Sequence, residues 1–95
     1  GAAVILASEE GIKRLGLDMG RAVRIASSAA GSERAGNNLN PDTALTADIM
    51  RLAVAQAQIA VTDLDVLEVH DAFSVEELLY AEAIDICKPG HYVPM

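Results

Sequence analysis

The stretch that decides the fold is residues 65–79, which read DVLEVHDAFSVEELL. Its first five residues, 65–69, are largely aliphatic and predict a buried strand. Ser74 and Glu77 have the spacing of a capping box, in which the serine hydroxyl bonds an amide and the glutamate reaches back, so a helix is expected to begin there. His70 stands between the two elements. Because ligands of open parallel sheets bind beyond the carboxyl ends of strands, this junction is the first candidate for a site.

The N-terminal third of the sequence also alternates between predicted strands and a predicted helix. Residues 2–7 form a short apolar run that predicts a buried strand. Residues 9–15 predict a short helix, with Ser8 as its cap and Gly16 as its stop. Residues 22–27 predict a second strand. The first third is therefore expected to be strand, helix, strand.

The middle of the chain changes in character. Residues 28–45 are rich in glycine and asparagine and predict a long loop, which in a compact domain is usually functional or covered. Thr46 is expected to cap the next helix, with Asp48 in its first turn, and apolar residues then recur at helical spacing through Ile59. The full order of strands and helices predicts an α/β fold of parallel strands covered by helices.

Composition limits the possible functions. The chain has 95 residues and a net charge of −7, so it repels phosphate backbones and nucleic-acid binding is not expected. Its single cysteine allows no internal disulfide and favours a reducing, intracellular compartment. No apolar run approaches the length of a membrane span, and no metal-binding or phosphate-binding motif is present. The first residue leads directly into an apolar run, which suggests a fragment.

Each chemically capable residue also has an ordinary structural interpretation. His70 could donate to a developing oxyanion, or could fill the end of a strand and bond a backbone carbonyl. Asp71 is more typical of a cap or turn than of an acid catalyst. Cys87 follows an apolar residue and is interpreted as a packed thiol, and His91 as a solvated residue of the tail.

Three segments resemble a known enzyme family. Residues 68–80, EVHDAFSVEELLY, resemble the sterol-carrier-protein type of thiolase, which has an HDxF histidine motif where ordinary thiolases have NEAF. The CKPG run at 87–90 and the GAAVILASEE run at 1–10 are similar to segments of the same group. The HDAF match is the specific part of this resemblance.

The resemblance implies a thiolase-like layered αβαβα fold, of which this chain would be a fragment. Residues 1–19 would be the last strand and helix of the N-terminal half, and residues 20–95 the beginning of the C-terminal half. His70 would belong to the oxyanion hole, and Phe73 would line the acyl or pantetheine channel. The family's nucleophilic cysteine, in the first half, has no counterpart here. Cys87 also lacks the CxG pattern of the family's second cysteine.

The implied function is part of a thiolase-type acyltransferase that cleaves 3-oxoacyl-CoA or catalyses the reverse condensation. Coenzyme A would be a substrate, with no bound cofactor and no metal. Expected partners are acyl-CoA in the complete enzyme and the remainder of the thiolase chain or a second copy. The alternatives are a thiolase-like aldolase or lipid-associated homologue without thiolysis, and a non-catalytic assembly module. The location would be cytoplasmic, or peroxisomal in a eukaryote.

Overall fold

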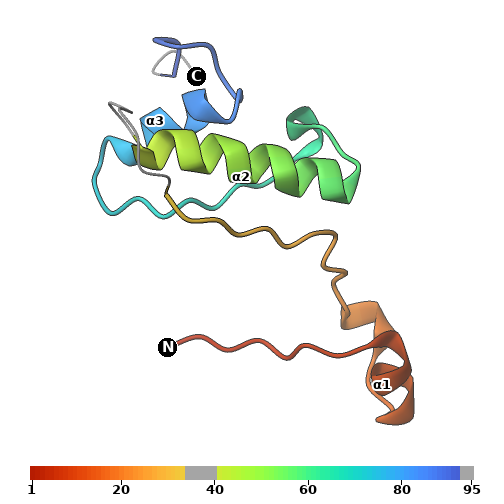
Figure 1. Cartoon of the computed structure of the whole chain (residues 1–95). Coiled ribbons are helices and arrows are strands. Elements are labelled where there is room, and N and C mark those ends of the chain that lie inside the picture. The colour runs from red at the N-terminus through yellow and green to blue at the C-terminus, as the bar shows by residue number, and fades with distance from the viewer. Residues whose placement is uncertain (34–40, 93–95) are drawn as a thin grey trace.

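A computed structural model describes residues 1–33 and 41–92 of the chain. Helices are the regular structure in these residues, and Figure 1 shows α1 lying apart from the other two α-helices. The elements in chain order are α1 (Glu9–Arg14), the 3₁₀ turn η1 (Met19–Arg21), α2 (Pro41–Ala57), the 3₁₀ turn η2 (Val61–Asp63) and α3 (Glu76–Ala83).

Helix α1 forms where the sequence predicts it. The Ser8 hydroxyl accepts a hydrogen bond from the Gly11 amide at 3.0 Å, which satisfies one of the free donors of the first turn. Lys13 and Glu9, one turn apart, form an exposed salt bridge of 2.8 Å. Gly16 follows the helix with a φ of 65°, the left-handed conformation of a helix stop. Both the cap and the stop of this helix are confirmed.

Helix α2 begins earlier than predicted. It starts at Pro41, so the assignment of residues 41–45 to a loop and of Thr46 to the cap is wrong. Proline is favoured at the first position of a helix, where its missing N–H is not needed. Asp48 lies inside the helix, where its carboxylate accepts a 3.1 Å hydrogen bond from Arg51. Residues 34–40 of the predicted loop lie outside the described residues.

The three predicted strands do not form a sheet in the described residues. Residues 2–7, 22–27 and 65–69 have no strand assignment. Most of their side chains are exposed, with 90% of Ile5 and 91% of Val23 accessible to solvent. A strand is stabilised by hydrogen bonds to a neighbouring strand and by burial of its apolar faces, and the described part of the chain supplies neither. The αβαβα layering is therefore not seen in this structure.

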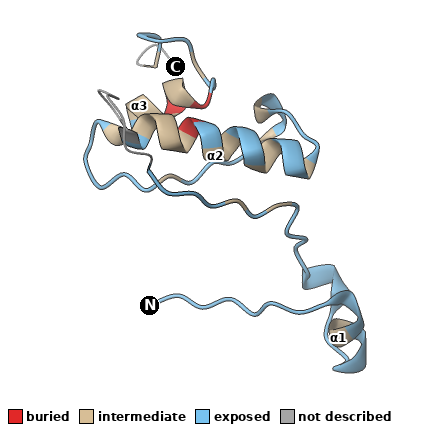
Figure 2. Cartoon of the chain, viewed as in Figure 1, coloured by how far each residue is buried: buried red, intermediate tan, exposed pale blue. Residues whose placement is uncertain are grey.

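The core is small and lies where α2 packs against α3. Its buried apolar residues are Ala47 on α2, Ala81 on α3, and Ile84 just after α3 (Figure 2). Alanine at the contact lets two helices approach closely, because little side chain separates their backbones. This helix pair is the part of the fold that positions the candidate site. Among the described residues, no helix is both long enough and apolar enough to span a membrane.

The start of α3 differs from the predicted capping box. The N-cap is Val75, in a helical backbone conformation and without a side-chain cap bond, so the assignment of Ser74 as the cap is wrong. The Glu76 carboxylate instead accepts a 2.8 Å hydrogen bond from the Ala72 amide. The Glu76 amide in turn donates to the Phe73 carbonyl at 2.9 Å. One glutamate thus closes the turn that carries Phe73.

Candidate functional site

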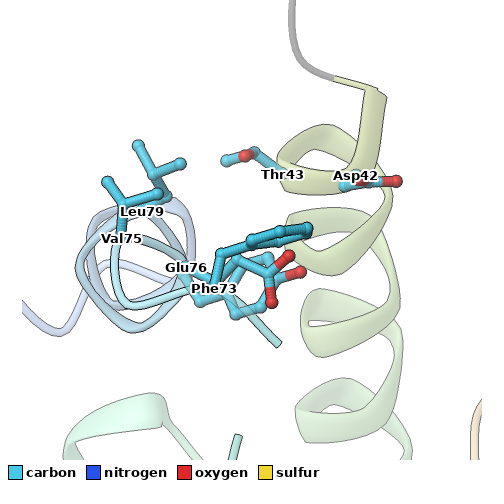
Figure 3. A pocket seen from close by; sticks show the side chains of 7 residues that line it. Asp42, Thr43, Phe73, Val75, Glu76 and Leu79 are labelled. Carbon is cyan, nitrogen blue, oxygen red and sulfur yellow. The ribbon is translucent and has the colours of Figure 1, made fainter. Parts of the chain in front are cut away.

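A pocket of about 200 Å³ lies where the first turns of α2 and α3 face each other (Figure 3). Its walls come from both helices and from the turn before α3. The lining residues are Asp42, Thr43, Phe73, Val75, Glu76, Leu79 and Tyr80.

Phe73 is held at this pocket by the local turn. The bonds from Ala72 to Glu76 and from Glu76 to Phe73 fix the backbone on both sides of the aromatic residue. Figure 3 shows its ring reaching from the α3 side toward α2. Phe73 remains 71% exposed, so the pocket is open on that side. The structure therefore places one of the two predicted site residues in a pocket wall.

The pocket carries negative charge. Asp42 and Glu76 are both carboxylates, and no lysine or arginine is among the lining residues. A hydrogen bond and charge repulsion from Asp42 raise the pKa of the neighbouring Glu33 carboxyl. Partial burial, followed by the charges of Glu76 and Asp42, raises the pKa of the Tyr80 phenol. The charges of Asp42 and Glu76 contribute to these shifts but are not the largest cause of either.

One polar atom in the pocket wall is buried without a partner. The Thr43 hydroxyl makes no hydrogen bond within the described part of the chain. An unpaired buried hydroxyl costs free energy, and this one has almost no surface open to solvent.

His70 lies outside this pocket. It is exposed, in irregular chain before the turn that carries Phe73, and it does not line the pocket. Asp71 is exposed beside it. Of the two residues that the resemblance assigns to a site, Phe73 lines the pocket and His70 does not. The oxyanion-hole role of His70 stays a prediction.

The remaining candidates belong to the segment after α3. Cys87 is a free, half-buried thiol, and His91 is exposed. The Tyr92 hydroxyl donates to the Glu77 carboxylate at 2.5 Å, and this bond is the main cause of the raised pKa of Tyr92. No group of side chains in the described residues could hold a metal ion.

Sequence reasoning missed Asp42 and Thr43 as pocket residues. Both fell within the predicted loop, so they were not assigned to a helix facing α3. The signal that could have found them is Pro41, which is a helix-starting residue with an acid directly after it.

Comparison with known proteins adds family information to this geometry. Residues 30–94 match the family model described as "Thiolase C-terminal domain-like". The chain is also 33% identical over 93 residues to the "Benzoylsuccinyl-CoA thiolase subunit BbsB" of Thauera aromatica. That alignment covers 93% of this chain and 23% of the relative, so the chain spans about a quarter of the relative's length. No solved structure matches the chain significantly.

Proposed function

The chain belongs to the thiolase C-terminal domain-like family, and on that premise we propose that it forms part of a thiolase-type acyltransferase acting on 3-oxoacyl-CoA. The observation that carries this proposal is the family match over residues 30–94, which spans the HDAF motif and both helices of the pocket. The HDxF form of that motif supports the sterol-carrier-protein type within the superfamily.

In this proposal His70 stabilises charge at the substrate carbonyl. Cleavage of a 3-oxoacyl thioester places negative charge on a carbonyl oxygen, and an imidazole N–H held beside that oxygen lowers the barrier. The family's acylated cysteine, which lies in its first half, has no counterpart in this chain, so the nucleophile is assigned to the rest of the enzyme. The chain's own contribution is a hydrogen-bond donor, not the covalent step.

Phe73 and its pocket form part of the surface along which the acyl group lies. The wall is apolar along Phe73, Val75 and Leu79, which suits a hydrocarbon chain. In this proposal coenzyme A enters as a substrate and not as a bound cofactor.

The proposed partner is the remainder of the thiolase. The exposed apolar segments 2–7 and 22–27 would gain neighbouring strands and helices in a larger body. The same exposure supports a second candidate function, a non-catalytic module that contributes a surface to a partner. The two functions differ in whether His70 acts on the substrate.

The test compares the two histidines of the chain in the complete enzyme. Replacing His70 by alanine is expected to lower kcat by roughly 10²–10³-fold with little change in KM, because loss of one oxyanion donor acts on the transition state. His91→Ala is the matched control, because His91 is exposed after α3 and does not line the pocket, and it should leave kcat unchanged. Turnover and the folded fraction are measured for both variants.

If His70→Ala keeps the turnover of the parent per folded molecule, the oxyanion role is wrong and the assembly-module function is favoured. If both variants lose turnover equally, the effect is not specific to the HDAF motif and the assignment of His70 also fails.

A further inference from the structure

Resting on the proposed function, we infer that Glu76 is a positioning residue, whose carboxylate sets the course of the chain between His70 and Phe73. Glu76 does not act on the substrate itself. It acts through the histidine and the phenylalanine of the HDAF motif, and it lies outside that motif in the sequence.

The bond that carries the inference joins the Glu76 side chain to the backbone of the motif. Its Oε2 atom accepts a hydrogen bond from the Ala72 amide at 2.8 Å. Ala72 lies two residues after His70 and directly before Phe73. A hydrogen bond to an ionised carboxylate is stronger than one between neutral groups. One side chain thus anchors the motif at a residue between its histidine and its phenylalanine.

The backbone of Glu76 makes a second bond to the same stretch. The Glu76 amide donates to the Phe73 carbonyl at 2.9 Å, which closes a turn over residues 73–76. Glu76 is also the first residue of α3, and α3 packs against α2 around the buried core. Glu76 therefore connects the HDAF motif to the helix pair through both its side chain and its backbone.

The chain before this turn has little structure of its own. In the described part of the protein, residues 66–71 belong to no helix, and both His70 and Asp71 are exposed. An exposed segment with few packing contacts is placed mainly by the bonds at its ends. The Ala72 bond therefore has a large share in deciding where His70 stands.

The placement of His70 matters for the proposed reaction. A donor stabilises an oxyanion only when it stands within hydrogen-bond distance of the oxygen on which charge develops. A misplacement of about 1 Å costs up to about 10²-fold in rate. Loss of the Glu76 carboxylate is therefore expected to lower kcat, although no part of Glu76 contacts the reacting atoms in this inference.

The test is a double-mutant cycle in the complete enzyme with acetoacetyl-CoA as substrate. Glu76→Ala is expected to lower kcat roughly 10–100-fold, because His70 loses its placement. Glu76→Gln should recover part of this loss, since its amide oxygen can still accept from Ala72. In the His70→Ala background, Glu76→Ala should cost less than about threefold further, because the residue that it positions is already absent.

Glu82→Ala is the matched control on the same helix. The Glu82 carboxylate accepts a hydrogen bond from the Gly90 amide at 2.7 Å, so this variant loses the same kind of bond on a segment outside the motif. It should lower the urea midpoint of unfolding about as much as Glu76→Ala does. Its kcat per folded molecule should stay that of the parent, which separates positioning from a general loss of stability.

Amide hydrogen exchange in residues 70–73 gives a readout that is independent of turnover. Glu76→Ala should speed exchange there, and Glu82→Ala should not. Unchanged exchange in Glu76→Ala overturns the inference. If His70→Ala lowers kcat, then an unchanged kcat in Glu76→Ala also overturns it, as does an equal loss with and without His70. Faster exchange together with a fully active His70→Ala enzyme contradicts the proposed function and supports the positioning of the chain by Glu76.

Discussion

Three residues in the left-handed region, Gly16, Gln58 and Asp85, end the three α-helices, with φ values of 65°, 58° and 62°. In each case the amide of that residue donates to the carbonyl three residues earlier, and the following amide donates to the carbonyl five residues before it. This is the Schellman pattern, which satisfies carbonyls that a helix end leaves free. Of these three positions the sequence predicts only Gly16 as a stop, because a glutamine and an aspartate carry no comparable signal. The stop expected for α3 at residues 87–90 lies beyond the end of that helix at Ala83.

Replacing Gln58 by glycine is therefore expected to stabilise the chain. A side chain in the left-handed conformation costs about 1 kcal/mol, and glycine removes this cost. Gln56→Gly is the matched control, since it lies inside α2, where glycine should destabilise by about 0.5–1 kcal/mol. The free energy of unfolding is measured in urea for both variants. Equal destabilisation by the two changes would contradict the assigned helix end.

At the scale of elements, the sequence predicts an element correctly where residues close to it in the chain provide its hydrogen-bond partners. Helix α1 is predicted to within a residue, because Ser8, the acids of its first turn and Gly16 all lie next to it. A strand depends on a neighbouring strand that is distant in sequence. An apolar run such as residues 2–7 therefore indicates a tendency to form a strand but does not provide the neighbouring strand. The prediction that Ser74 caps the helix is wrong. The Glu76 carboxylate accepts a hydrogen bond from the Ala72 amide and closes the turn instead.

The start of α3 gives a direct test of that correction. Ser74→Ala is expected to change the free energy of unfolding by less than about 0.5 kcal/mol, because Ser74 is exposed and makes no cap bond. Glu76→Ala should cost about 1 kcal/mol, since the Ala72 amide loses its acceptor. Glu76→Gln should recover part of the loss. A large loss of unfolding free energy with Ser74→Ala and none with Glu76→Ala would instead support the predicted capping box.

At the scale of the molecule, the chain buries little and exposes much. Within residues 1–33 and 41–92 the buried side chains are confined to the α2–α3 contact, whereas Val4, Ile5 and Val23 are each at least 86% exposed. Figure 2 shows the exposed segments leading away from the helix pair. Exposed apolar side chains of this kind favour association with other protein surfaces.

We accordingly expect the pure 95-residue chain to self-associate or to bind the remainder of its enzyme. Sedimentation over a range of concentrations measures this, and charged substitutions at Val4 and Val23 should reduce the association. Leu52→Lys, on an exposed position of α2, is the control and should have less effect. A compact monomer at high concentration with cooperative unfolding would instead describe an independent domain.

The candidate site was predictable in part. The HDAF motif pointed to Phe73, and the structure places Phe73 in a pocket. The partners of Phe73 on α2 were not predictable, because they face it only through the packing of two helices that are about thirty positions apart in the sequence. The position of His70 relative to a substrate depends on surfaces that these residues alone do not form.

We propose that this chain supplies a C-terminal domain-like segment of a thiolase and not its nucleophile. Coenzyme A-dependent cleavage of acetoacetyl-CoA, followed side by side for the isolated chain and for the complete enzyme, tests this proposal. We expect cleavage by the complete enzyme and none by the isolated chain, because covalent catalysis requires a nucleophile that the chain does not carry. Cleavage by the isolated chain that Cys87→Ala abolishes would show the proposal to be wrong, as would a complete enzyme that cleaves no 3-oxoacyl-CoA.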